Sequence, residues 1–232
     1  MRKILLIIFS GIFCFTALSQ QNIKLKKKDR KRDVELVTTN GTMILRLSDS
    51  TPLHRDNFLR LVKAHYYDSL LFHRVIKNFM IQAGDPNSKR AQHGQMLGIG
   101  ETGYTIPAEF HSSLFHKKGA LAAARQSDEI NPQKASGGSQ FYIVQGMKFT
   151  DGGLDSVETF RLKRKIPAEL RNVYKTIGGT PQLDQNYTVF GEVVQGLEVI
   201  DSIASEETSR RPPDRPVKDV RIIKARLIKR KK

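Results

Sequence analysis

The residues best suited to chemistry lie in one short segment, LFHRVIKNFMIQAGD, which runs from Leu71 to Asp85. Its apolar and polar residues alternate, and this pattern predicts two short strands joined by a bend around Lys77-Asn78. On the first strand, Arg74 offers a rigid fork of N–H donors. The second strand offers two large apolar side chains and an amide: Phe79, Met80 and Gln82. One surface would then hold a fixed donor beside an apolar wall; a pair of core strands with an exposed arginine is the plainer alternative.

A second segment, GGSQFYI from Gly137 to Ile143, follows downstream. Together the two segments closely resemble the signatures of the cyclophilins, the peptidyl-prolyl cis–trans isomerases, in which FHR-x(4)-FM-x-Q-x-GD marks the active face. The resemblance covers roughly Val34 to Ile228 and implies a mainly β fold, a closed eight-stranded antiparallel β-barrel capped by α-helices. It also implies an enzyme that acts on proline-containing polypeptides without a cofactor or a metal ion.

The resemblance assigns roles to individual residues. Arg74 would be the catalytic donor, and Gln82 and Gln140 would bind the substrate backbone and orient the arginine. The remaining groove residues would be the proline-ring contacts Phe79, Met80, Tyr142 and Leu183, followed by Ala124, Arg125, Gln126 and Tyr187. We expect Phe72 and Phe141 to pack in the core instead.

The chemistry implied by these residues is rotation about a peptide bond that precedes proline. The barrier is roughly 18–20 kcal/mol because the nitrogen lone pair is delocalised into the carbonyl, and uncatalysed exchange takes tens of seconds or more. Catalysis requires an apolar socket for the proline ring and a donor that favours a pyramidal nitrogen. An arginine on a barrel strand is costly to bury without such a task, which favours a functional role for Arg74.

The sequence departs from the common cyclophilin pattern at the rim of the groove. It contains no tryptophan, so Gln182 stands before Leu183 where relatives often carry Trp. Tyr187 replaces a histidine, Tyr142 a phenylalanine and Arg125 an asparagine of many relatives. Bacterial relatives often lack the same Trp and His, so we expect activity to survive, whereas binding of the family's cyclic peptide drug is put in question.

The surrounding segments predict the elements that position these residues. A hairpin is predicted around Asn40-Gly41, and Thr51-Pro52 has the pattern of an N-cap and first helical residue. Further elements are predicted as a strand at 187–194, a helix at 197–203, a Pro-rich turn and a closing strand at 220–228.

Residues 148–181 are absent from the common single-domain cyclophilin pattern. Some bacterial cyclophilins carry an insertion of this kind before the LD-x(5)-FG element. Val157–Lys165 is basic and amphipathic, and Pro167–Ile177 predicts a helix that Gly178-Gly179 ends. A helical insertion beside the groove could shape the choice of client, or could pack on the barrel with no role in recognition.

Residues 1–19 have the pattern of a cleaved signal peptide. Two basic residues precede an apolar run from Ile4 to Leu18, and Ala17-Leu18-Ser19 provides small residues before the cut. The run is shorter than the roughly 20 residues of a bilayer span. We therefore expect an exported, periplasmic protein. Cys14, the single cysteine, lies in the leader, so the mature chain would have neither a disulfide nor a cysteine nucleophile.

The formal net charge is +16, and many of the cations lie at the two ends of the chain. Residues 20–32 predict a disordered basic linker and residues 229–232 a basic tail. A solubilising fringe explains both, and weak contact with an anionic membrane surface or with acidic clients is the alternative. Nucleic acid is not expected as a partner, because no aromatic residues interleave with the basic ones. We expect a monomer.

Three other kinds of site are not supported by the sequence. His111 and His116 are five residues apart, which is not a zinc spacing. The glycine-rich stretch 94–103 lacks the Lys-Ser/Thr ending of a phosphate loop and reads as a surface loop. Ser139 lies in G-S-Q-F and not in G-x-S-x-G, so a serine hydrolase is rejected.

Two functions remain for the groove. The first is a prolyl isomerase that assists the folding of envelope proteins. The second is a non-catalytic chaperone or scaffold that binds proline segments and is anchored by its basic ends. The intact FHR, FM, Q and GSQ set favours the enzyme, and a basic surface-binding protein unrelated to proline is a third, weaker reading.

Overall fold

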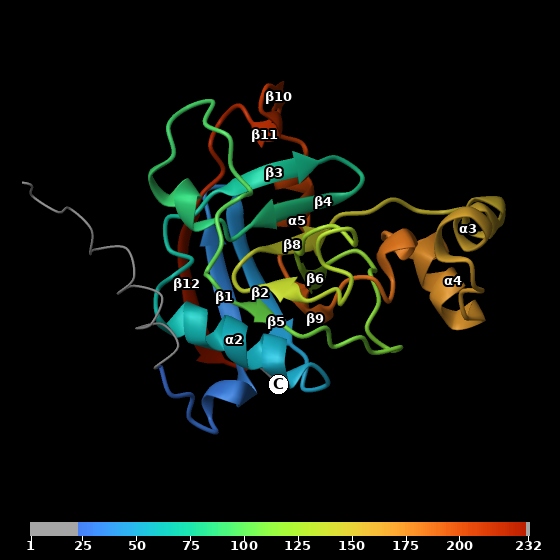
Figure 1. The fold of residues 1–232 in the computed structure, drawn as a ribbon, viewed down its shortest axis with the longest axis horizontal. Coiled ribbons are helices and arrows are strands. Elements are labelled where there is room, and N and C mark those ends of the chain that lie inside the picture. The colour runs from blue at the N-terminus through green and yellow to red at the C-terminus, as the bar shows by residue number, and fades with distance from the viewer. Residues whose placement is uncertain (1–22, 231–232) are drawn as a thin grey trace, which may run out of the picture.

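The computed structural model of the protein describes residues 23–230. Its centre is one antiparallel sheet with the strand order β12-β1-β2-β9-β6-β8-β4-β3 (Figure 1). The eight strands are β1 (Arg32–Thr38), β2 (Gly41–Leu47), β3 (Phe72–Ile76), β4 (Met80–Ala83), β6 (Ala120–Ala123), β8 (Phe141–Val144), β9 (Val189–Gln195) and β12 (Ile222–Lys229). The prediction of a mainly β, eight-stranded antiparallel fold is confirmed.

The sheet curls until its two edge strands meet at one end. Ser69 N donates to Ile222 O at 2.8 Å, Phe72 N to Val220 O at 2.9 Å, and Ile222 N to Leu70 O at 2.8 Å. These bonds join the start of β3 to the start of β12, and no ladder between the two strands follows in residues 23–230. The predicted fully closed barrel is therefore a curled sheet that is joined at one end.

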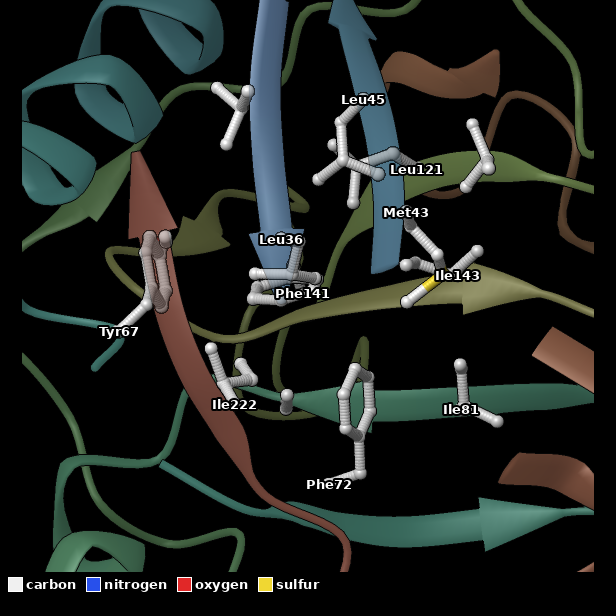
Figure 2. Packing of buried hydrophobic residues seen from close by; sticks show 14 of the residues in the cluster. Leu36, Met43, Leu45, Tyr67, Phe72, Ile81, Leu121, Phe141, Ile143 and Ile222 are labelled. Atoms are coloured by element: carbon white, nitrogen blue, oxygen red, sulfur yellow. The ribbon is translucent and has the colours of Figure 1, made fainter. Parts of the chain in front are cut away.

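Alternation along the strands divides side chains between the inside of the curled sheet and its outer face. On β8, Phe141 and Ile143 join the main core, whereas Tyr142 and Val144 belong to a second cluster on the outer face. Figure 2 shows the inner set filling the enclosed space, with Leu36, Met43, Leu45, Phe72, Ile81, Leu121, Phe141, Ile143 and Ile222 among its members. Phe72 and Phe141 thus pack in the core, as predicted.

Two helices pack against the sheet and several short elements connect it. Helix α2 (Pro52–Lys63) contacts β12 and β9, and α5 (Leu197–Ala204) contacts β2 and β4. The short elements are η1 (Asp29–Lys31), η2 (Pro86–Arg90), η4 (Pro181–Leu183), the strand pair β5 (Thr105–Ile106) and β7 (Ser136–Gly137), and the hairpin of β10 (Thr208–Arg210) and β11 (Pro213–Pro216).

Helix α2 begins where predicted, but its N-terminus is capped by a distant residue. The side chain of Thr51 makes no capping hydrogen bond. The carboxylate of Glu109 accepts instead, from Leu53 N at 3.0 Å and His54 N at 2.9 Å. A carboxylate satisfies two free N–H groups and also carries the charge that a helix N-terminus favours, so it serves better here than a hydroxyl.

The insertion is helical, and it stands out from the sheet on the side away from α2 (Figure 1). It consists of α3 (Asp151–Val157), a π-helical turn η3 (Glu158–Leu162) and α4 (Ala168–Thr176). The first helix begins earlier than the predicted segment 157–165, because Thr150 accepts from Gly153 N at 3.2 Å and caps it. The π-helical turn η3 continues this helix to Leu162, and Lys163, with φ +56°, follows as its C-cap.

The basic N-terminal segment is more ordered than the predicted linker 20–32. Its one acid, Asp29, is buried, and the Asp29 carboxylate pairs with Lys63 Nζ at 2.9 Å. Arg30 pairs with Asp56 at 2.7 Å, and strand pairing begins already at Arg32. Residues 29–32 are therefore part of the domain, because their ion pairs fix them to helix α2. The predicted tail likewise begins inside β12.

Within residues 23–230, no helix is long and apolar enough to cross a membrane. The predicted signal peptide, which contains Cys14, lies outside the residues that the structure describes.

Candidate active site

The outer face of the sheet carries an apolar pocket of about 160 Å³. Side chains from β3, β4 and β8 form it together with the residue before β4, the segment after β6 and the segment before β9. Its lining residues are Arg74, Phe79, Met80, Gln82, Ala124, Arg125, Tyr142, Leu183 and Tyr187. The structure thus brings together nine of the residues predicted for the site, and the other two, Gln126 and Gln140, line the adjoining groove.

Arg74 is held by a chain of oriented amides. Its Nη1 donates to Gln82 Oε1 at 3.4 Å, and Gln82 Nε2 donates to Gln140 Oε1 at 3.0 Å. Gln140 Nε2 in turn donates to the carbonyls of Gly98 and Gly100 at 3.0 and 2.8 Å. Each amide fixes the orientation of the next, so the chain presents an oxygen to the arginine. The glycine-rich stretch is a loop, as predicted, and it anchors this chain.

A second partner of Arg74 comes from the far end of the sequence. Asp214 Oδ2 accepts from Arg74 Nε at 3.4 Å. Asp214 lies on the β10–β11 hairpin at a φ of +63°, in the segment predicted only as a Pro-rich turn. No local sequence pattern links Arg74 to Asp214, because the two residues lie far apart along the chain. The presence of an acid in the Pro-rich turn was the only feature that could have suggested this contact.

The pocket wall contains a tyrosine whose hydroxyl points away from solvent. Tyr142 is 5% exposed, and its Oη lies 2.9 Å from His116 Nε2. Burial raises the pKa of the Tyr142 hydroxyl well above its ordinary value, so the group stays protonated. On the pocket side the ring meets Tyr187 edge-on, with 6.0 Å between ring centroids. The sequence pattern assigned no role to His116, which is fully buried behind the wall.

Arg125 covers one side of the pocket and does not present a free charge to it. Its guanidinium carbon lies 4.4 Å from the centre of the Tyr187 ring, a cation–π geometry. Nε donates to Asn186 O at 2.8 Å, and Nη1 pairs with Asp128 at 2.6 Å. The positive charge of Arg125 beside the groove is therefore largely compensated.

The pocket continues into a groove of about 340 Å³. Gln82, Ala124 and Arg125 line both cavities. In the groove, Gln126 Nε2 donates to Glu101 Oε1 at 2.6 Å. An apolar pocket that opens into a longer, more polar groove suits an extended polypeptide with one apolar ring at a fixed place.

Other chemistries find no support in residues 23–230. No group of three or more His, Cys, Asp or Glu side chains in that range could hold a metal ion. Glu109, His54 and Ser136 have the order of a hydrolytic triad, with Glu109 Oε2 2.7 Å from His54 Nδ1 and His54 Nε2 2.9 Å from Ser136 Oγ. However, His54 and Ser136 are 2% and 1% exposed and line neither the pocket nor the groove. The hydrogen bonds of Glu109, His54 and Ser136 therefore stabilise the fold and do not form a catalytic triad.

Comparison with known families shows which family the chain belongs to. A family model described as cyclophilin type peptidyl-prolyl cis-trans isomerase/CLD matches residues 33–227. The chain belongs to the cyclophilins. This membership makes it an enzyme of the peptidyl-prolyl cis–trans isomerase class.

Three bacterial proteins are among the relatives of this cyclophilin. One from Staphylococcus haemolyticus (strain JCSC1435) is 33% identical over 194 residues, covering 83% of this chain and 89% of the relative. One from Staphylococcus aureus (strain COL) is 33% identical over 208 residues, covering 85% and 93%. Both are named as peptidyl-prolyl cis–trans isomerases. A Streptococcus pyogenes protein named as a bifunctional phosphatase/peptidyl-prolyl cis–trans isomerase is 37% identical over 191 residues, and the match spans 37% of its length.

Solved structures agree on the fold. A Cryptosporidium parvum cyclophilin type peptidyl-prolyl cis–trans isomerase superposes with a TM-score of 0.61 at 21% identity, covering 86% of this cyclophilin and 99% of the other chain. The same protein, determined in the presence of the dipeptide Ala-Pro, superposes with a TM-score of 0.60 at 22% identity, covering 85% and 99%.

Proposed function

We propose that this cyclophilin accelerates rotation about X-Pro bonds by holding the proline ring in the pocket beside the Arg74 guanidinium. The observation that carries the proposal is the position of Arg74, which lines the apolar pocket while 44% of its side chain remains exposed. A ligand can therefore reach both the socket and the donor. The crystallographic use of Ala-Pro with the Cryptosporidium parvum cyclophilin supports the substrate class.

The mechanism needs no covalent intermediate. As the peptide twists, the lone pair localises on the proline nitrogen, and an N–H of Arg74 can donate to it only in that twisted state. An interaction made only in the transition state accelerates the reaction. Gln82 and Gln140 keep the guanidinium in place, so the cost of orienting it is met before the substrate binds.

The proposal is tested in a protease-coupled assay with an Ala-Pro peptide. Replacing Arg74 with Ala should lower kcat/KM by about 10²-fold, the usual effect of losing one transition-state donor. Arg74→Lys should recover little, because an ammonium does not reproduce the planar fork. Arg161→Ala, an exposed arginine on the insertion, is the matched control and should have no effect.

Equal rates for the wild type and Arg74→Ala would reject the role of the arginine. A wild type that binds the peptide without accelerating its isomerisation would instead favour the chaperone or scaffold reading.

We also propose that the protein is exported and assists the folding of proline-containing proteins of the cell envelope. The signal-peptide pattern of residues 1–19 supports this. N-terminal sequencing of the protein from the periplasmic fraction should begin at Gln20, and a protein that remains in the cytoplasm with its leader would contradict the proposal.

The basic ends are proposed to make weak contact with an anionic membrane surface, and the protein to act as a monomer. Lys26, Lys27 and Lys28 are exposed, although Arg30 is already paired with Asp56. Sedimentation with phosphatidylserine vesicles should decline as salt is raised, because surface attraction is screened. Binding that does not respond to salt, or a dimer in light scattering, would contradict these two proposals.

A further inference from the structure

The insertion places one fully buried polar side chain, Tyr174 of α4, against the barrel. Its ring meets Phe115 and Phe149 edge-on, with 5.6 and 6.4 Å between ring centroids. Its hydroxyl donates to Asp184 Oδ2 at 2.6 Å. Asp184 is 3% exposed and follows Leu183, which lines the proline pocket. The insertion therefore contacts a residue adjacent to the pocket wall.

From Asp184 the hydrogen bonds continue to the pocket. Asp184 Oδ1 accepts from His116 N and lies 2.9 Å from His116 Nδ1. A carboxylate only accepts, so Nδ1 carries the proton and Nε2 is left as the acceptor for the Tyr142 hydroxyl at 2.9 Å. Tyr174, Asp184, His116 and Tyr142 thus form one chain of hydrogen bonds that converges on the Asp184 carboxylate, and each hydrogen in it has a defined acceptor.

The backbone reinforces this link where the insertion returns to the barrel. Thr180 N donates to His116 O at 2.8 Å. A Cβ added at Gly179 would lie 2.2 Å from His116 O and 2.7 Å from Tyr174 Cε1. Only a glycine lets the end of the insertion approach His116 this closely.

We infer that Tyr174 is a positioning residue for the proline pocket: it fixes the pocket wall through Asp184, His116 and Tyr142, so that the insertion sets the affinity for proline segments. This inference rests on the function proposed above. Without the Tyr174 hydroxyl, Oδ2 of the buried Asp184 carboxylate loses its donor, and only the His116 donors on Oδ1 still hold the group. His116 and the Tyr142 ring then lose their fixed orientation.

We expect loss of the Tyr174 hydroxyl to weaken substrate binding and to leave the chemical step unchanged. Tyr142 and Leu183 wall the pocket for the proline ring in the cis, trans and twisted states alike, whereas Arg74 acts in the twisted state. Loss of such uniform binding raises KM and leaves kcat unchanged.

The test is Tyr174→Phe, which keeps the ring and deletes the donor. In the Ala-Pro assay KM should rise about three- to tenfold, with kcat within about twofold of the wild type. Arg171→Gln is the control for general loosening of the insertion, because it breaks ion pairs with Asp151, Asp155 and Glu158 without touching the chain. Tyr66→Phe controls for loss of a tyrosine hydroxyl elsewhere, since its partner Ser139 still donates to Gly84 O.

A double variant tests the path itself. Tyr142→Phe cuts the chain at the pocket, so adding Tyr174→Phe to it should change KM by less than about twofold. An unchanged KM in Tyr174→Phe, an equal rise in Arg171→Gln, or a full effect of Tyr174→Phe in the Tyr142→Phe background would each overturn the inference.

Two further measurements remain informative if the proposed activity fails or Tyr174→Phe does not fold. The ¹⁵N shifts of His116 in the wild type should show a proton on Nδ1 and none on Nε2, and the opposite tautomer would overturn this arrangement of donors and acceptors. If the wild type does not accelerate isomerisation, NMR titration with the Ala-Pro peptide replaces the assay. A three- to tenfold weaker Kd for Tyr174→Phe supports the inference, and an equal Kd overturns it.

Discussion

Arg74 is held from two sides, by Gln82 on the neighbouring strand and by Asp214 on the β10–β11 hairpin. An arginine side chain has several rotatable bonds, and holding it in one conformation before the substrate arrives lowers the cost of its hydrogen bond in the transition state. The ion pair between Arg74 and Asp214 is partly exposed and long, at 3.4 Å. We therefore expect it to contribute only weakly to holding the arginine.

Asp214→Ala should therefore lower kcat only about two- to fivefold, in line with a partly exposed ion pair, with little change in KM. Asp219→Ala is the control, because Asp219 pairs with Arg215 and Arg221 and not with Arg74. An unchanged or increased kcat in Asp214→Ala, measured in the Ala-Pro assay, would show that Asp214 does not position the arginine.

At the scale of elements, helix α2 depends on a residue outside it. Glu109 accepts hydrogen bonds from two backbone N–H groups of the first turn. Its Oε2 also lies 2.7 Å from Nδ1 of the His54 ring. Burial lowers the pKa of His54, and hydrogen bonding to Glu109 acts in the opposite direction. The helix N-terminus and the buried Glu109–His54–Ser136 chain are thus stabilised by one carboxylate.

Glu109→Ala should lower the free energy of unfolding by about 2–3 kcal/mol, because it removes a charged helix cap and leaves a buried ring nitrogen without its partner. Thr51→Ala should cost less than about 1 kcal/mol, since the Thr51 side chain makes no capping hydrogen bond. Urea denaturation measures both. A larger loss in Thr51→Ala than in Glu109→Ala would contradict the assignment of the cap.

The insertion is the other element whose role depends on its contacts. Its own core is small, with Leu154, Ile166 and Tyr174 as its buried members, and it is bound to the barrel by hydrogen bonds as well as by apolar packing. The sequence left open whether it affects recognition. The insertion is connected to the pocket wall through the hydrogen bond from Tyr174 to Asp184. A role of the insertion in recognition can therefore be tested by removing this bond.

At the scale of the whole molecule, stability should fall in mild acid because histidines are buried uncharged. Burial lowers the pKa of His73 on β3 from 6.5 to about 4; Asp85 opposes this shift, while Arg74 and Arg215 add to it. Below its unfolded pKa, the unfolded chain binds a proton at this residue that the folded chain does not bind. The free energy of unfolding therefore decreases as the pH falls from about 6.5 towards 4.

Between pH 7 and pH 5, His73 alone should remove about 2 kcal/mol of stability. Urea denaturation of the wild type and of His73→Gln at both pH values isolates this contribution, because other groups titrate equally in the two proteins. The variant should lose about 2 kcal/mol less than the wild type over this range. Equal losses would show that His73 is not the responsible group.

The sequence by itself determined the parts of the site that follow from local periodicity. Alternation on β4 and β8 places Met80, Gln82 and Tyr142 on one face, because successive residues of a strand point to opposite sides. Together with the family signatures, this was enough to predict the eleven site residues that the pocket and its groove bring together.

Only the tertiary structure decided the contacts between segments distant in sequence. Asp214 beside Arg74, Glu109 at the N-terminus of α2, and the chain from Tyr174 to Tyr142 all join side chains whose own segments show no sign of the partner. Local patterns report which face of an element is apolar, but a hydrogen bond across the molecule depends on how the elements pack, and this is fixed only when the whole sheet has curled around its core.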